Sequence, residues 1–289
     1  MKWMKLFPAL LLFANTLFAQ GDDGLKVFIS VDMEGISGVV VSSECSRSGK
    51  DFGLFRKIMT EDTNAAIEGA AAAGATEIIV RDSHGVKRNI LPDLLDPRAK
   101  LLRGVSGATK NMMDTIDESY DAVIFIGYHA KAGTPDAIIE HTSSGNVTDL
   151  SINGVSIPEA GYNALIAGLY DVPVAFVSGD QAVCRQVTEL FGNVETVAVK
   201  EAIGGAAICL HPKVAGEKIK AGVQKALGNL EQFKPYKMSA PYTMVLKMKS
   251  EEKVYSGALY PGAERTGDWE ITYTSDNLLD VIEAFNKIR

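Results

Sequence analysis

The sequence predicts an α/β protein with a largely parallel sheet covered by helices on both faces, followed by a smaller α+β C-terminal portion. From residue 25 onward, continuous apolar strands alternate with helical patterns, which is typical of parallel strands buried on both faces. After about residue 200 the pattern changes to a Lys- and Ala-rich helix and shorter alternating strands. About 270 residues follow a predicted leader, enough for one large domain or two modest ones.

The leader has the composition of a secretory signal. Two lysines precede an apolar run (residues 6–18) that is short for a bilayer span, and Ala19 offers a small residue for cleavage. We therefore expect residues 1–19 to be a signal peptide and the protein to be periplasmic or secreted, with an uncleaved N-terminal anchor as the alternative. No later segment is apolar enough to cross a membrane, so no stable span is expected after cleavage.

The first predicted elements form the parallel sheet. A strand at 25–31 is followed by a helix whose apolar residues recur at helical spacing and which Gly74 closes. Asp180 is suited to begin a later helix by capping it. Four further apolar runs predict strands at 76–80, 121–127, 172–179 and 194–199.

One insertion interrupts this alternation. Asn153-Gly154 lies between two short alternating runs and is the strongest hairpin signal in the chain. Pro158 then favours the first turn of a helix, which places Glu159 at that helix's N-terminus.

The C-terminal portion is mixed. A helix at 212–228, with His211 at its start or on the surface, precedes two strands, PYTMVLKM and WEITYTS. A terminal helix with one apolar face completes the chain. We expect an α/β metal-binding domain at 20–200 and a smaller α+β unit at 201–289 packed on it.

Composition restricts the partners and the redox chemistry. The formal net charge is −7 and the sequence has no basic cluster, which argues against nucleic-acid binding and favours neutral or cationic small partners. Three cysteines without a CxxC pair do not make a disulfide framework. We expect Cys184 and Cys209 to be core residues in helical contexts, with one bridge involving Cys45 as the alternative.

Three consecutive predicted strands end in residue types that bind metals. Ligands of open parallel sheets bind beyond the carboxyl ends of the strands, so these side chains are expected to converge. Three of the four histidines fall in or just after these loops. The candidates are Asp32 and Glu34 after the first strand, Asp82, Ser83 and His84 after the second, Tyr128 and His129 after the third, and then His141.

Two carboxylates and two histidines, joined by Glu159 from the helix after the hairpin, form a mixed oxygen and nitrogen ligand set. Such a set suits zinc, with manganese or cobalt as alternatives. Five protein ligands exceed what one catalytic zinc with an open position needs, and suit two ions roughly 3.5–4 Å apart. Asp32 is the predicted bridge; alternatively, Asp32 and Glu34 are turn-forming or helix-capping acids.

Six motifs occur in order along the chain: SVDMEGISG, DSHG, GYHAKAGTP, the histidine of IIEHTS, INGVSIPEAGYNA and VPVAFVSGD. Together they resemble the zinc-dependent D-aminopeptidase family of the dipeptide-transport-operon type. The resemblance covers residues 25–215 and continues more weakly to the end. It implies release of N-terminal D-amino acids from short peptides with a free N-terminus, and assembly into large two-layered homo-oligomeric rings; the D preference rests on the resemblance alone.

The resemblance also assigns roles. It implies two zinc ions per chain, with the Asp32 position contacting both, and His141 as the catalytic histidine. Glu61 and Asn163 lie in stretches that match the family, whereas Asp82 and Ser83 adjoin a ligand and either orient it or cap a turn. The implied ligands are Asp32, Glu34, His84, His129 and Glu159.

The chain departs from the family pattern in three ways. One extra residue lies between Pro135 and His141, which alters the loop that carries this histidine. AIGGAAICLHP has glycine and alanine where the pattern is more polar, so substrate contacts from that side are expected to differ. The predicted export of this protein differs from the cytoplasmic location of other members of the family.

Two other functions remain open from the residues. Another dinuclear hydrolase, such as a phosphoesterase, uses similar ligands. It would need nearby cations to bind the phosphate, for which Lys131 and Arg81 are candidates. An exported metal- or peptide-binding protein would use the site without catalysis. For the aminopeptidase we expect a metal-activated water, with His141 passing a proton to the leaving amine or stabilising the oxyanion.

Overall fold

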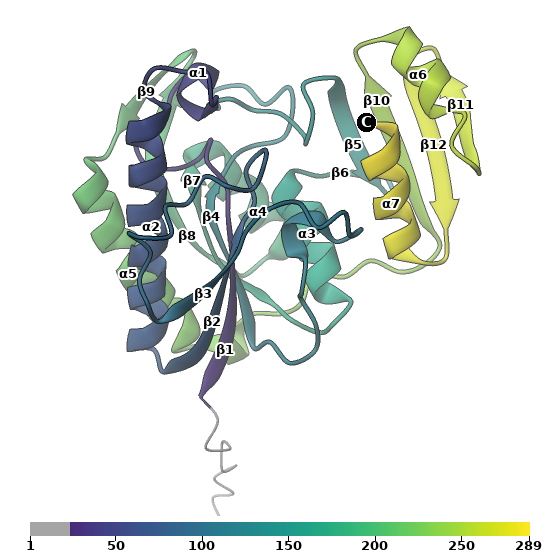
Figure 1. Cartoon of the computed structure of the whole chain (residues 1–289). Coiled ribbons are helices and arrows are strands. Elements are labelled where there is room, and N and C mark those ends of the chain that lie inside the picture. Colours follow the sequence, from purple (N-terminus) through teal and green to yellow (C-terminus); the bar gives the residue numbers. More distant parts are fainter. Residues whose placement is uncertain (1–23) are drawn as a thin grey trace, which may run out of the picture.

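A seven-stranded sheet forms the centre of the protein, which we describe from a computed structural model over residues 24–289. The predicted signal peptide lies outside the described residues. Every neighbouring pair in the sheet is parallel except β8 and β9. The strand order is β3 (Ala99–Leu102), β2 (Ala75–Asp82), β1 (Leu25–Val31), β4 (Ala122–Tyr128), β7 (Val174–Asp180), β8 (Glu195–Ile203) and β9 (Ala206–Cys209) (Figure 1).

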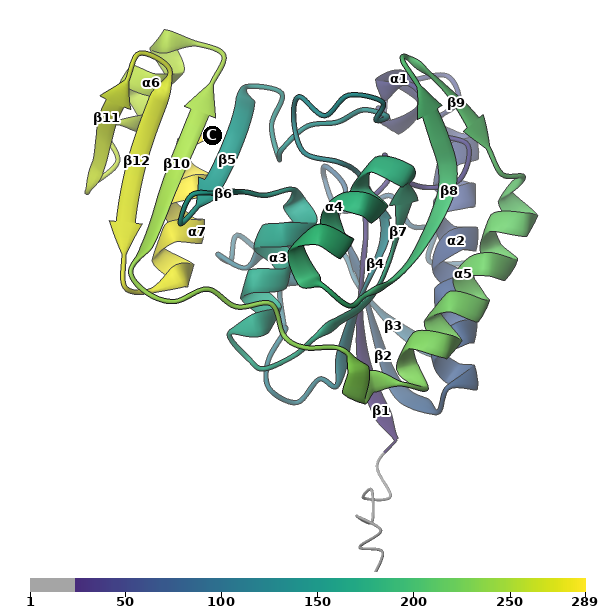
Figure 2. The ribbon, with the colours of Figure 1, turned by 180° about the vertical axis from the view of Figure 1, so that it is seen from behind.

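Helices cover both faces of this sheet, as Figures 1 and 2 show: α2 (Phe52–Ala72) and α5 (Pro212–Leu227) on one face, α3 (Glu159–Gly168) and α4 (Gln181–Phe191) on the other. Alternate residues of β1 face opposite sides, so Val27 and Ile29 join the α2–α5 core while Phe28 joins the α3–α4 core. Each such fully buried side chain contributes roughly 1.5–3 kcal/mol.

The predicted strands of this sheet are present, and two edge strands were missed. β3 and β9 have only four residues each, and both are partly exposed, so neither leaves a strong apolar run. Cys209 lies in β9, so its predicted helical context is wrong. Cys45, Cys184 and Cys209 are all free thiols, which excludes the alternative of a bridge.

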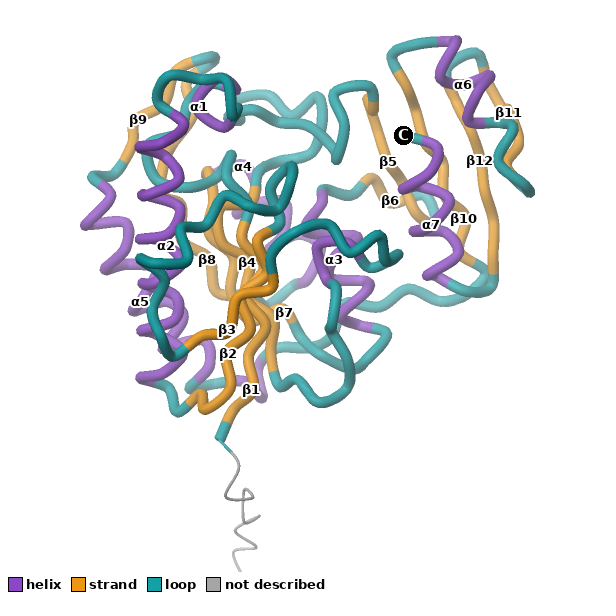
Figure 3. Tube along the Cα trace, viewed as in Figure 1, coloured by secondary structure: helices purple, strands orange, loops and turns teal. Residues whose placement is uncertain are grey.

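A second, antiparallel sheet of five strands lies beside the first unit, with α6 (Glu251–Gly257) and α7 (Leu278–Ile288) packed on it (Figure 3). The predicted hairpin is present: Asn153 and Gly154 both have positive φ, at 51° and 79°, as a tight turn of this kind requires. The strand order is β11 (Ala263–Gly267), β12 (Glu270–Ser275), β10 (Tyr242–Met248), β5 (Val147–Ile152) and β6 (Val155–Ser156).

The division of the chain differs from the expected boundary at residue 200. β9 and α5 belong to the first unit, whereas the hairpin strand β5 leaves it and pairs with β10, with Leu150 opposite Leu246. Both leucines lie in the same buried cluster as Phe28 of the large sheet. The two sheets therefore share one core, which no single cut in the sequence separates.

Several helix boundaries agree with the sequence. Asp180 caps α4 by accepting a hydrogen bond from Val183 N (2.8 Å), and His211 is the N-cap of α5. Glu159 is the first residue of α3, with Pro158 at the cap. Among residues 24–289, no helix has an apolar stretch long enough to cross a bilayer.

The fold gathers positive charge that is dispersed in the sequence. Arg56 of α2 donates to Asn89 O (2.6 Å), in the loop after β2. A hollow of about 380 Å³ is lined by Arg47, Phe52, Arg56, Arg88 and Arg103. A basic cluster is therefore present in three dimensions although the linear sequence shows none.

Candidate metal centre

The ends of three neighbouring parallel strands bring the predicted ligands to one edge. β1 lies between β2 and β4, and pairing continues past its end, because Asp32 N donates to Ile126 O and Ser83 N donates to Val31 O (2.8 Å each). The residues that follow these strands therefore start from adjacent points. This is the convergence that the sequence predicted.

Gly35 allows the loop after Asp32 to fold tightly over β4. Its N–H donates to Gly127 O (2.8 Å), and a Cβ at this position would lie 1.9 Å from Tyr128 O. Any other residue would push this loop away from β4. The neighbouring Glu34 is thereby held at the edge of the sheet.

Asp32, Glu34 and His84 form the first group of potential ligands. His84 Nδ1 lies 3.2 Å from Asp32 Oδ1 and 3.1 Å from Glu34 Oε2. The other ring nitrogen, Nε2, lies 3.0 Å from Cys45 O, which can only accept. Nε2 therefore carries a hydrogen, and in the neutral ring the lone pair on Nδ1 faces two carboxylates.

His129, His141 and Glu159 form the second group. His129 Nδ1 donates to Ala130 O (3.0 Å) and His141 Nδ1 donates to Ile139 O (2.9 Å). Their Nε2 atoms lie 3.4 and 3.6 Å from Glu159 Oε1, and the two rings stack with centroids 3.9 Å apart. Nε2 of His129 is buried without a hydrogen-bond partner, as expected of an atom that ligates a metal.

The two groups are continuous with each other. Asp32 presents Oδ1 to His84 and Oδ2 to His129 Nε2, at 3.7 Å. Glu34 similarly places Oε1 4.0 Å from His141 Nε2. Each group can hold an ion, since its ligand atoms lie within 4.8 Å of one another, and Asp32 faces both.

The electrostatics of this cluster require positive charge. Burial alone would lower the pKa of His129, but Glu159 and the other carboxylates raise it to about 10. The pKa of His84 is likewise raised to about 11, against the effect of burial, by Glu34 and Asp32. The cluster therefore holds cations, as protons on its imidazoles or as metal ions, and its oxygen and nitrogen atoms suit zinc.

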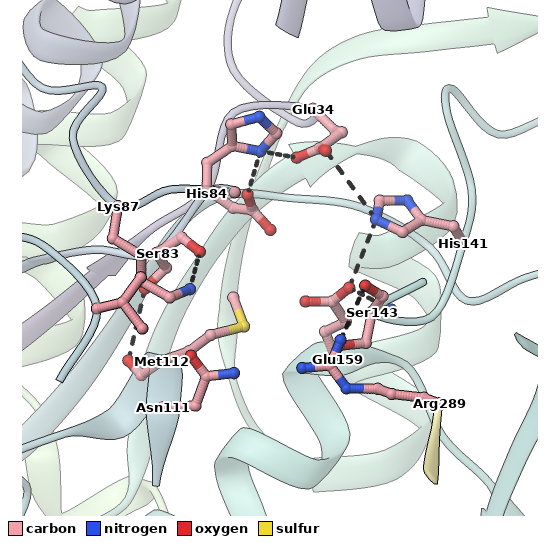
Figure 4. A pocket seen from close by; sticks show the side chains of 13 residues that line it. Glu34, Ser83, His84, Lys87, Asn111, Met112, His141, Ser143, Glu159 and Arg289 are labelled. Atoms are coloured by element: carbon pink, nitrogen blue, oxygen red, sulfur yellow. Dashed lines mark hydrogen bonds and ion pairs between the residues drawn. The ribbon is translucent and has the colours of Figure 1, made fainter. Parts of the chain in front are cut away.

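A cavity of about 340 Å³ opens onto the cluster (Figure 4). Its wall includes two cations that the sequence analysis missed, Lys87 and Arg289. Lys87 could have been found from its position, three residues after His84 in the same loop. Arg289 is far from every motif in the sequence. The lining residues are Asp32, Glu34, Ser83, His84, Gly85, Lys87, Val105, Asn111, Met112, His141, Ser143, Glu159 and Arg289.

The predicted supporting residues have different positions. Asp82 accepts from Ile90 N (2.8 Å) and from the Asn89 side chain (2.8 Å), so it shapes the loop after His84 and does not touch the imidazole. Ser83 lines the cavity. Asn163 donates to Tyr128 Oη (3.1 Å), beneath the site.

Glu61 is not at the site. It is about half exposed on α2 and pairs with Lys57 (3.8 Å), because helical spacing places residue 61 on the outer face. The next residue, Asp62, is buried and accepts hydrogen bonds from Ser37 N (2.9 Å) and Ser37 Oγ. Asp62 thus secures the loop that follows Glu34.

Replacing Asp62 by alanine is expected to lower the free energy of unfolding by about 1–3 kcal/mol at pH 4, because it leaves the Ser37 donors unpaired. Burial raises the pKa of Asp62 to about 6, although Ser37 acts in the opposite direction. A raised pKa favours folding at low pH, so this contribution is lost as the pH rises through about 6. Urea unfolding at pH 4 and pH 7 should show the larger loss at pH 4.

The matched control is Glu61→Ala, which should change the unfolding free energy by less than about 0.5 kcal/mol at both pH values. A loss in the Asp62 variant that grows from pH 4 to pH 7 would contradict this assignment.

Neither cation proposed for a phosphoesterase lines the cavity. Arg81 is buried and forms an ion pair with Asp114 (3.3 Å). Lys131 donates a hydrogen bond to the Ser156 hydroxyl on the hairpin. The two cations that the sequence offered for a phosphoesterase are therefore not at the site, where Lys87 and Arg289 are the cations instead.

A largely parallel α/β sheet with three carboxylates and three histidines gathered around a cavity at one edge defines a metallohydrolase. A family described as D-aminopeptidase matches residues 25–287, and the chain belongs to this family. The chain is 34% identical over 264 residues to the D-aminopeptidase of Bacillus subtilis (strain 168), covering 90% of this chain and 95% of that protein.

A solved structure agrees with this membership. The Zn-dependent D-aminopeptidase DppA from Bacillus subtilis, a self-compartmentalizing protease, matches with a TM-score of 0.89 and 32% identity. The match covers 91% of this chain and 96% of that chain. The predicted family and fold class are confirmed.

Proposed function

We propose that this protein releases N-terminal amino acids, with the D configuration preferred, from short peptides at a dinuclear zinc site. One observation carries the proposal: the ring nitrogens of His84, His129 and His141 that make no hydrogen bond to the backbone converge on three buried carboxylates. Membership of the D-aminopeptidase family and the zinc dependence of the Bacillus subtilis relative support the activity and the metal.

The ligands divide between two ions. Asp32, Glu34 and His84 would hold one, and His129 and Glu159 the other. We assign Asp32 as the residue that would contact both ions; the positions of its two oxygens, which face the two groups, support this assignment. When bound, zinc lowers the pKa of a water toward neutrality and polarises the scissile carbonyl; manganese and cobalt are alternatives for the same ligands.

The protein's own side chains orient the substrate and move the proton. The net charge of −7 on the protein favours the approach of the cationic N-terminus of a peptide. His141 is about one-quarter exposed at the cavity wall, and its ring is fixed by Ile139 O and by stacking on His129. We propose that His141 Nε2 delivers a proton to the leaving amine. The alternative role of His141 is that of a sixth ligand, because its Nε2 lies 3.6 Å from Glu159 Oε1.

We also propose export, on the basis of residues 1–19, and assembly into a homo-oligomer. The self-compartmentalizing character of the Bacillus subtilis relative supports the assembly.

Metal analysis beside a substrate panel tests this function. The purified protein should contain about two zinc ions per chain and should hydrolyse D-aminoacyl anilides faster than their L-enantiomers. A chelator should abolish the activity and zinc should restore it. Hydrolysis of phosphoesters without aminopeptidase activity would favour the alternative hydrolase, and bound zinc with no hydrolysis would favour a binding protein.

A further inference from the structure

We infer that Arg289 binds the C-terminal carboxylate of the substrate, which makes the site selective for dipeptides with a free carboxyl group. The inference rests on the proposed aminopeptidase function and specifies its substrate class.

The guanidinium of Arg289 is held in place at the cavity wall by neutral groups (Figure 4). One terminal nitrogen donates to Ser143 O (3.2 Å) and the other to Asn286 Oδ1 (3.2 Å). The guanidinium also lies over the Phe285 ring, 5.3 Å from its centroid. No carboxylate side chain of residues 24–289 forms an ion pair with it, so the charge is fixed in position and free to pair with an anion.

Arg289 lies close to the proposed metal ligands. Ser143 connects them, because its N–H donates to Glu159 Oε1 (2.6 Å) while its carbonyl accepts from Arg289. A single residue therefore separates the metal cluster from the guanidinium. In a dipeptide, a single residue likewise follows the scissile carbonyl, and consecutive Cα atoms are about 3.8 Å apart. The cluster and Arg289 line the same cavity, so a dipeptide with its scissile bond at the cluster is positioned to present its terminal carboxylate to Arg289.

A second hollow continues the cavity beyond this residue. It has a volume of about 260 Å³ and shares Val105, Asn111 and Arg289 with the first cavity. Arg289 therefore stands at the junction of the two. A dipeptide ends at this junction, whereas a longer peptide must continue past the guanidinium and leave it unpaired.

Lys87 is the other cation of the cavity and is less suited to this role. It is 6% exposed, and its ammonium donates to Ser83 O. Figure 4 shows it across the cavity from Arg289. An ammonium is a point charge, while the planar guanidinium matches both oxygens of a carboxylate. The two cations can be separated by mutation.

The test compares D-alanyl-D-alanine, its C-terminal amide and D-alanyl-D-alanyl-D-alanine in the wild type, Arg289→Gln and Lys87→Met. The wild type should prefer the free dipeptide by about 10- to 100-fold in kcat/KM, mainly through KM. In Arg289→Gln, kcat/KM should fall about 10- to 100-fold more for the dipeptide than for the amide, which abolishes the preference. Lys87→Met should retain the preference. Lys253→Gln, on exposed α6, is the matched control for loss of a positive charge.

Three results would overturn the inference: no preference in the wild type, an equal loss on dipeptide and amide in Arg289→Gln, or a preference that disappears only in Lys87→Met. If the wild type hydrolyses none of these substrates, the proposed function fails. Calorimetric binding of the same dipeptide and amide to the zinc-loaded proteins then decides the role of Arg289 independently, by the same comparison.

Discussion

Replacing Asp32 by asparagine is expected to reduce aminopeptidase kcat/KM by about a thousand-fold or more and to lower the zinc content. Asp32 is buried, and its two carboxylate oxygens face His84 and His129, one in each ligand group. Asparagine has nearly the same shape but replaces one anionic oxygen with an NH₂ group, which cannot ligate a cation. Loss of the proposed bridge is expected to cost several kcal/mol of transition-state stabilisation, and about 4 kcal/mol corresponds to the stated factor.

Metal analysis and steady-state kinetics on the same preparation check this result. Asp171→Asn is the matched control, because Asp171 is an exposed carboxylate paired with Lys237 at the surface. That variant should keep full activity and full metal content. An Asp32→Asn protein with normal zinc and normal turnover would exclude the bridging role.

Replacing His141 by glutamine is expected to reduce kcat by about a hundred- to ten-thousand-fold, the range typical for removal of a general acid or base. Its Nε2 faces the cavity, while Nδ1 is fixed by Ile139 O. Since Asp32, Glu34, His84, His129 and Glu159 remain, the zinc content should not change. KM should change little if His141 acts only on the leaving amine.

The zinc content of the His141 variant decides between two roles. Retention of both ions with a low kcat supports proton transfer, whereas loss of one ion assigns His141 as a sixth ligand in the group with His129 and Glu159. His211→Gln is the control, because this exposed histidine caps α5 and its replacement should leave both zinc and kcat unchanged. Normal kcat in His141→Gln would exclude either role.

The site could be predicted to a large extent because its residues directly follow strands. A buried apolar run ends visibly in the sequence, so Asp32, His84 and His129 could be placed at one edge once parallel pairing was predicted. Glu159 was found through Asn153-Gly154, whose turn chemistry marks the hairpin before α3. In each case a local signal fixed the element, and the geometry of a parallel sheet supplied the convergence.

The failures have a common physical cause. Glu61 and Asp62 are adjacent acids, and only the phase of α2 against its neighbours decided that Asp62 is buried on Ser37. The edge strands β3 and β9 are short and partly exposed, so their apolar pattern in the sequence is weak. The boundary near residue 200 was misplaced because β5 crosses to pair with β10, and long-range pairing leaves no local signal.

By itself, the sequence determined the α/β class, the order of the main strands and helices, the family and the set of residues able to bind a metal. The class, the elements and the candidate ligands follow from periodicity, turn chemistry and side-chain chemistry, which act over a few residues, whereas the family followed from the resemblance of six motifs. Only the tertiary structure decided which ring nitrogens face the carboxylates, that Lys87 and Arg289 enter the cavity, and that the two sheets share one core. Those features depend on contacts between distant segments, as when Arg289 meets Ser143, and such contacts form only when the whole chain packs.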